Sequence, residues 1–121
     1  MMPRRVLHVL AACLLSGCAA DVGTFTSLGV LRAPKPETHK VEIFKNGLPS
    51  RPFERVAILD AHCESQWFAT PSEEDCLPEL IHQAQAAGCD AIIEIREKKI
   101  EAPGNFETRA RHYTGVGVAY R

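Results

Sequence analysis

The stretch that decides the fold is "LPELIHQAQAAGCDAIIEI", residues 77–95. Its first half predicts an amphipathic helix, because its apolar residues recur at the spacing of one helical face. That apolar stripe comprises Leu77, Leu80, Ile81, Ala84 and Ala87. Gly88 is a suitable residue just past a helix end. The chain then runs directly into a predicted strand, "DAIIEIREKKIE" at residues 90–101, whose inward residues we expect to be Ala91, Ile93 and Ile95.

The start of this helix carries its own signals. Ser72 or Asp75 can cap it, and the acidic run Glu73-Glu74-Asp75 suits the positive end of a helix dipole. We interpret this run as helix-start capping, not as a catalytic acid/base pair. Since proline inside a helix removes a hydrogen bond, Pro78 predicts that regular helical bonding begins only around that residue.

Three further strands are predicted around the helix. Residues 40–45, "KVEIFK", alternate and are rich in β-formers. Residues 53–63, "FERVAILDAHC", form a second strand, with Val56, Ile58 and Asp60 on one face and Arg55, Ala57 and Leu59 on the other. Residues 107–121, "ETRARHYTGVGVAYR", form the last, with Val116, Val118 and Tyr120 on one face and Gly115 and Gly117 on the other. The predicted fold is α+β in the order β-β-α-β-β, with one helix packed on a mainly antiparallel four-stranded sheet.

Composition sets the class of protein. The chain has 121 residues, which suits one small domain. Its formal net charge of −1 argues against nucleic acid as a partner, since phosphate binding needs a basic surface. Five cysteines are many for a cytosolic chain of this size, and they indicate an oxidising compartment.

The N-terminus accounts for that compartment. Arg4 and Arg5 precede an apolar run, residues 6–15, which has the length of a signal-peptide core and is too short to span a bilayer. A plain secretory signal cut near residues 19–20 and a signal that is never cut are alternatives. However, Leu15-Ser16-Gly17-Cys18 resembles a bacterial lipobox, in which the cysteine is acylated and the signal is cut just before it. The resemblance implies a mature chain that begins at Cys18.

This resemblance divides the chain into three parts. Residues 1–17 are the predicted lipoprotein signal peptide, residues 18–39 the lipidated N-terminus and a tether, and residues 40–121 the periplasmic α+β domain. Several acyl chains on Cys18 would hold the protein in the membrane. Ala19, where an aspartate is absent, favours the outer membrane by resemblance to enterobacterial lipoproteins. A partner-binding peptide at residues 25–31 is an alternative use of the tether.

Three cysteines remain in the predicted domain, and an odd number cannot all pair within one chain. Cys63 and Cys76 bracket a polar loop, and we predict a disulfide between them, which would stabilise the fold by about 3 kcal/mol. Cys89 lies where the helix passes into the buried strand, so we expect it to be buried and unpaired. A Cys63–Cys89 bridge and an intermolecular bridge are open alternatives.

Soft ligands raise the question of a metal. His62, Cys63, Cys76, His82 and Cys89 are side chains that zinc or copper uses. Their spacing matches no compact ligand motif, and His82 lies off the apolar stripe, where exposure to solvent is expected. No nucleophile-elbow, metalloprotease, phosphate-loop or dinucleotide motif occurs. We therefore predict no catalytic residues, no metal site and no cofactor.

Two segments resemble known families. "VEIFKNGLPSRPFERVAILD" at residues 41–60 and "AAGCDAII" at residues 86–93 resemble small bacterial envelope lipoproteins of the RcsF type, and the second segment is also similar to the YbjQ-like family. The resemblance implies a disulfide-supported domain that hangs from the outer membrane on a proline-containing tether. Cys89 departs from the pattern, which usually has alanine there. Only Cys63 has a plausible counterpart among the bridging cysteines.

The predicted function follows from these parts. We expect a non-enzymatic, lipid-anchored outer-membrane lipoprotein whose small periplasmic domain binds an envelope protein in sensing or assembly. The alternative is a metal-binding or thiol-redox envelope lipoprotein that uses Cys63, Cys76 and nearby histidines.

Overall fold

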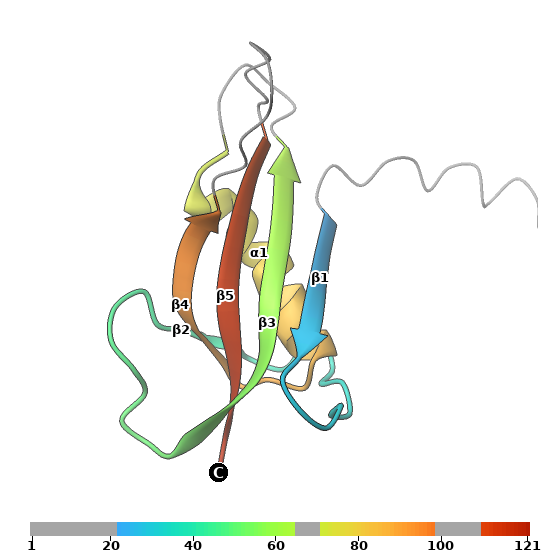
Figure 1. Ribbon diagram of the computed structural model, residues 1–121, viewed down its shortest axis with the longest axis vertical. Helices are drawn as coiled ribbons and strands as arrows, with labels where there is room; N and C mark the ends of the chain where they lie inside the picture. The colour runs from blue at the N-terminus through green and yellow to red at the C-terminus, as the bar shows by residue number, and fades with distance from the viewer. Residues whose placement is uncertain (1–21, 65–70, 99–109) are drawn as a thin grey trace, which may run out of the picture.

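The computed structural model describes residues 22–64, 71–98 and 110–121. They form a five-stranded sheet with one helix packed on one side, as Figure 1 shows. The elements are β1 (Val22–Ser27), β2 (Glu42–Ile43), β3 (Phe53–Glu64), α1 (Glu73–Ala86), β4 (Ala91–Lys98) and β5 (Ala110–Tyr120). The predicted α+β class with a single helix is confirmed for these residues.

The sheet has the order β1-β3-β5-β4-β2. Long antiparallel pairings join β3 to β5 and β5 to β4, and β1 pairs antiparallel with β3. β2 pairs with β4 in parallel, so the sheet is mixed. The sheet is mainly antiparallel, as predicted, but the described residues form five strands and not four, and the pairing of β2 with β4 is parallel.

The additional strand is β1, which lies in the segment predicted to be a tether. Thr and Phe alternate in "VGTFTS", and Phe25 packs against the main core while its neighbours face the other side. Gly23 lies under the helix: a Cβ there would lie 2.5 Å from Glu79 Oε1. The tether interpretation is thus wrong for residues 22–27, because an open edge of β3 and the side of α1 give this short segment two surfaces to bind.

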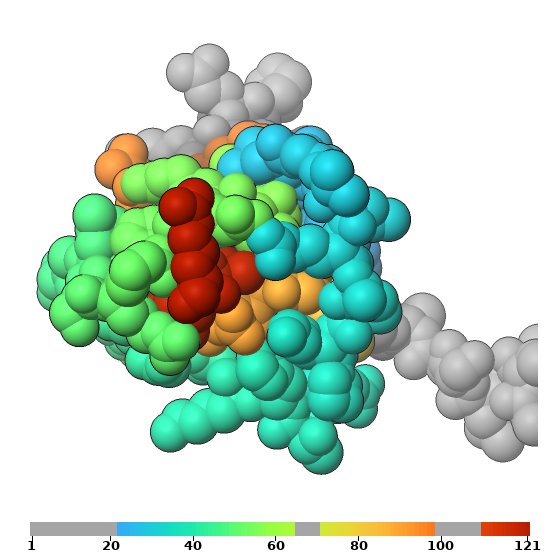
Figure 2. Space-filling model, turned by 90° about the horizontal axis from the view of Figure 1, so that it is seen from below, coloured from blue at the N-terminus to red at the C-terminus, as the bar shows by residue number. Residues whose placement is uncertain are grey.

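The segment that follows β1 is also attached to the domain. Gln85 is buried on α1, and its side-chain amide donates hydrogen bonds to the carbonyl oxygens of Glu37 and His39, at 2.9 and 3.0 Å. The Lys35 amide donates to the Gln85 carbonyl at 2.8 Å. Figure 2 shows this part of the chain, in blue to cyan, running along one side of the molecule. Residues 28–39 are therefore part of the folded unit.

β2 is shorter than the predicted strand at residues 40–45. Only Glu42 and Ile43 pair with β4, although the Phe44 amide still donates to the Ile92 carbonyl at 3.0 Å. The Phe44 ring packs against a second apolar cluster on the side of the sheet opposite α1. The chain turns away from β4 after Phe44, and Gly47 in this turn has a positive φ of 77°.

α1 begins earlier than predicted. Ser72 is its N-cap, and the Ser72 amide donates to the Asp75 carboxylate at 2.7 Å, which confirms the capping interpretation of Asp75. Pro78 lies inside the helix, five residues after Glu73. The prediction that helical bonding starts around Pro78 is wrong, because the caps stabilise the first turn and the proline removes a single donor.

The predicted apolar stripe faces the sheet. Leu80, Ala84 and Ala87 are buried, and Leu77 and Ile81 pack against the core with part of their surface exposed.

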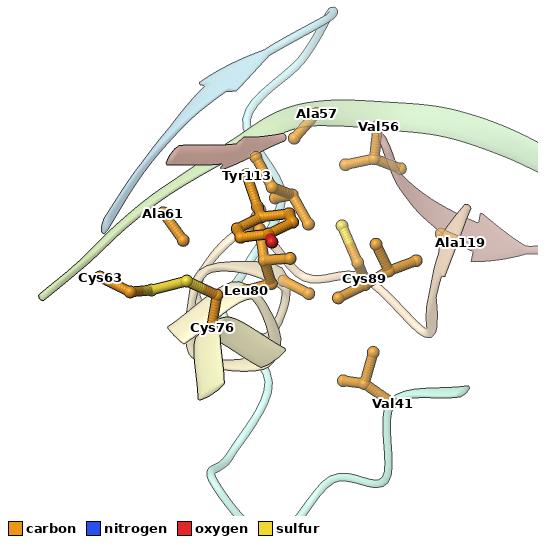
Figure 3. Close-up of a cluster of buried hydrophobic side chains, with 14 residues drawn as sticks. Val41, Val56, Ala57, Ala61, Cys63, Cys76, Leu80, Cys89, Tyr113 and Ala119 are labelled. Carbon is orange, nitrogen blue, oxygen red and sulfur yellow. A yellow bond between two sulfur atoms is a disulfide. The ribbon is translucent and has the colours of Figure 1, made fainter. Parts of the chain in front are cut away.

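Gly115 and Gly117 of β5 allow the connection between α1 and β4 to pack closely against the sheet. A Cβ on Gly117 would lie 2.5 Å from Cys89 Sγ, and one on Gly115 would lie 2.8 Å from Ile92 Cγ2. Figure 3 shows Cys89 among the side chains of this core. The absence of side chains at these two positions makes room for the connection.

Two β-bulges redistribute side chains between the faces. A register shift between Arg55 and Ala57 places Arg55 beside Val118, on the face away from the helix, while Val56 is buried in the main core. A second irregularity follows Ile93, where Glu94 has a positive φ of 53°.

The predicted inward set of β4 is consequently wrong in part. Ile92 and Ile95 belong to the main core with α1, whereas Ala91 and Ile93 pack with Val118 on the opposite face. The predicted strand extends to residue 101, but residues 99–101 lie outside the described residues, as do residues 107–109 of the last predicted strand.

Candidate functional site

The predicted disulfide is present. Cys63, at the end of β3, is bonded to Cys76 in the second turn of α1, with the two Cα atoms 5.7 Å apart. Both cysteines are buried, and Figure 3 shows the bridge between strand and helix. The pair thus closes the connection between β3 and α1 and is no longer available as two thiolates.

Cys89 is buried and free, as predicted. Burial is the main cause that raises the pKa of its thiol to about 11, and the nearby Asp90 carboxylate adds to the effect. A thiol with so high a pKa is protonated at neutral pH, so Cys89 is a poor nucleophile and a poor metal ligand.

The remaining predicted residues do not gather at one site. His82 lies on the exposed side of α1, as expected. Cys18 and the rest of the lipobox lie outside the described residues. Among the described residues, no group of three or more His, Cys, Asp and Glu side chains is arranged to hold a metal ion. No helix in the described ranges is long and apolar enough to cross a membrane.

The structure instead brings two histidines together on the side of the sheet opposite α1, which we call the far face. His62 on β3 and His112 on β5 lie directly opposite each other in the antiparallel register. Their ring centroids are 4.3 Å apart at an interplanar angle of 62°. His62 Nδ1 and His112 Nε2 are 2.5 Å apart, so one ring nitrogen donates to the other.

Charged groups lie on both sides of this histidine pair. His62 Nε2 contacts Glu64 Oε1 at 2.9 Å, and His112 Nδ1 lies 3.7 Å from Asp60 Oδ1. Lys98 Nζ lies 3.7 Å from the other Asp60 oxygen. We call these five residues the histidine cluster. They form one continuous chain of polar contacts across three strands.

The histidine cluster borders a shallow hollow of about 610 Å³. The hollow is lined by Val22, Gly23, Thr24, Asp60, His62, Lys98 and His112. Both imidazole rings are partly exposed, with 30% and 23% of their side-chain surface accessible. The cluster can therefore be reached by a small ligand.

The sequence pointed to His62 but not to its partners. His112 and Lys98 are distant from His62 along the chain, and they reach it only through the pairing of β3, β5 and β4. The alternation of "RHYTGVGV" does place His112 on the same face as Val116 and Val118. That signal becomes useful only once the register between β3 and β5 is known.

Comparison with known proteins supports the fold of this chain and gives no information about its function. No protein-family model matches the chain, and no curated protein matches it. Among solved structures, the chain is similar to a crystal structure of a Francisella virulence factor, FvfA, with a TM-score of 0.53 and 14% sequence identity. The match covers 80% of this chain and 96% of that one. At this identity the likeness shows that the arrangement of helix and strands is shared with that protein.

Proposed function

We propose that this chain is a non-enzymatic lipoprotein, anchored in the outer membrane through acyl chains on Cys18, whose periplasmic domain binds another envelope protein. The role is sensing or assembly, by the resemblance described above. The observation that carries the proposal is the buried Cys63–Cys76 disulfide. Disulfides of this kind persist in oxidising compartments, and the signal-like N-terminus supplies a route to one.

The position of β1 supports a domain held close to its anchor. β1 starts at Val22, only four residues after Cys18. Four extended residues span about 14 Å at most. Val22 lies opposite His62, so the end of the sheet that carries the histidine cluster is the end nearest the anchor. An acylated Cys18 would therefore keep this end within reach of the membrane surface.

The far face offers a surface for a protein partner. Ile58 lies on β3 near the middle of that face with 40% of its surface exposed, beside the exposed Thr26 of β1. On its other side Ile58 pairs with Val116 of β5, so two apolar side chains lie together on this face, as the apolar centre of a binding surface requires. Arg55 and Glu94 form a two-point ion pair farther along the same face, at 2.8 and 3.0 Å.

The thiol-redox alternative is less well supported. Its two candidate cysteines are joined and buried, and the remaining described cysteine, Cys89, has a raised pKa. Cysteine redox catalysis needs an accessible thiolate with a lowered pKa.

Site-specific crosslinking tests the binding proposal. A photoreactive amino acid is placed at Ile58 in the full chain expressed in its own envelope, and at His82 on the exposed side of α1 as the control. We expect discrete adducts with an envelope protein from position 58 and none, or different ones, from position 82. Equal patterns from both positions, or no adduct from position 58, would contradict a partner surface on the far face.

A further inference from the structure

We propose that His62 and His112 bind one divalent first-row transition-metal ion, Cu²⁺ or Zn²⁺, at the hollow on the far face. This inference goes beyond the proposed function and does not depend on the lipid anchor. It concerns a pair of imidazoles, not the cysteines that the sequence offered as thiolate ligands.

The geometry of the two rings is the first argument. Directly opposite residues on antiparallel strands have neighbouring side chains, so two imidazoles can share one ion. His62 Nδ1 and His112 Nε2 already face each other at 2.5 Å. An ion with metal–nitrogen bonds of about 2.0–2.1 Å in tetrahedral geometry holds the two nitrogens about 3.3 Å apart. The two nitrogens would have to move apart by roughly 0.8 Å. Both side chains are partly exposed, so they have room for this movement.

The outer nitrogens supply the second argument. A histidine that binds a metal usually has its other ring nitrogen held by a carboxylate, which fixes the ring and raises its basicity. Here the outer nitrogen of His62 contacts Glu64 at 2.9 Å, and that of His112 lies 3.7 Å from Asp60. The order carboxylate, imidazole, imidazole, carboxylate is thus present, and the two inner nitrogens face each other at the position where an ion would bind.

The hollow provides the remaining coordination positions. Two imidazoles leave an ion with open positions, which water or a ligand from the partner would fill. Imidazole with oxygen ligands suits Cu²⁺ and Zn²⁺, and Cu²⁺ binds such a set more tightly. One residue opposes binding: the Lys98 ammonium lies 3.7 Å from Asp60 and would repel a nearby cation.

Metal titration of the full chain in detergent, without a polyhistidine tag, tests the proposal. CuCl₂ and ZnCl₂ are titrated separately by calorimetry, and the Cu²⁺-loaded protein is examined by electron paramagnetic resonance. We expect one equivalent of metal and a spectrum with coupling to two nitrogen nuclei. His62→Gln and His112→Gln should each weaken binding at least tenfold and leave coupling to one nitrogen at most.

The controls separate this site from general metal binding. His82→Gln removes an exposed histidine outside the cluster and should leave affinity and spectrum unchanged. Asp60→Asn should weaken binding by about tenfold, and Lys98→Met should strengthen it several-fold. Circular dichroism of each variant checks folding, and Lys98→Met retains every ligand.

Three results would overturn the proposal. One is binding by the His62→Gln/His112→Gln double variant as tight as that of the unchanged protein. Another is a loss on His82→Gln equal to the loss on His112→Gln. The third is a Lys98→Met protein that binds no more tightly than the unchanged one.

Discussion

The contact between β5 and the helix-to-strand connection gives a sharp test of the packing. In Gly117→Ala, the new Cβ would lie 2.5 Å from Cys89 Sγ, but 3.4 Å from Cys89 Cβ and 3.5 Å from Leu59 Cδ2. The last two are ordinary contacts or nearly so. Only the sulfur atom is in the way, so the clash should be relieved by removing that one atom.

The magnitude follows from two opposing effects. Overpacking a close-packed core destabilises a protein by about 1–3 kcal/mol. Replacing glycine by alanine stabilises it by about 0.4–1 kcal/mol, because the unfolded chain then has less conformational entropy. We expect Gly117→Ala to lower the free energy of unfolding by about 1–2 kcal/mol on balance. Cys89→Ala alone should cost about 1 kcal/mol, as the loss of one small buried group does.

The double variant Gly117→Ala/Cys89→Ala shows whether the two residues interact. If the effects were independent, Gly117→Ala/Cys89→Ala would lose about 2–3 kcal/mol; we expect it to lose about 1 kcal/mol, a coupling of 1–2 kcal/mol. The assay is urea-induced unfolding followed by circular dichroism under non-reducing conditions. Gly115→Ala is the matched control, because its new Cβ would meet Ile92 at 2.8 Å and not Cys89. Additive losses for Gly117→Ala, or equal relief of Gly115→Ala by Cys89→Ala, would refute the reasoning.

Three further predictions concern the same core. Gln85→Leu should lower the free energy of unfolding by about 1–3 kcal/mol, because two backbone carbonyls of residues 28–39 lose their buried donor. Limited proteolysis should then cut that segment faster. An unchanged cleavage pattern would argue against the attachment of the segment to the domain. Cys63→Ser/Cys76→Ser should cost about 2–4 kcal/mol by urea unfolding, whereas a loss below 1 kcal/mol would contradict a structural disulfide. Burial raises the pKa of Cys89 to about 11, so the native state keeps a proton that the unfolded chain releases; stability should therefore fall as the pH rises from about 9 toward 11, by up to about 3 kcal/mol more than in Cys89→Ala, and identical pH profiles for the two proteins would show that the thiol does not titrate in this way.

Local patterns in the sequence were sufficient to predict the helix and the two longest strands. The stripe from Leu77 to Ala87 identified α1, and the β-forming residues of the predicted strands 53–63 and 107–121 identified β3 and β5. The two cysteines that flank a single loop also indicated their own pairing. Gly117 is a further local signal, because a glycine inside a strand often marks a place where another part of the chain packs closely, here Cys89.

The remaining features depend on contacts between distant segments. β1 is short and contains two weak strand formers, and it is ordered by β3 and by the side of α1. The bulge after Arg55 changes which residues face the helix, and nothing in residues 53–57 signals it. The meeting of His62 with His112 requires the β3–β5 register, which local periodicity does not contain.

The most direct test of the proposed function is the mass of the mature N-terminus. The full chain is expressed in its own envelope, and the purified membrane protein is digested and its N-terminal peptide identified by mass spectrometry. We predict a peptide that begins at Cys18 and carries acyl chains, and we expect Cys18→Ser to abolish both the acylation and the cut before residue 18, whereas Cys13→Ser leaves both unchanged. An unmodified N-terminus at Ala19 or beyond, or a Cys18→Ser protein that is cut before residue 18 just as Cys13→Ser is, would contradict the lipid anchor.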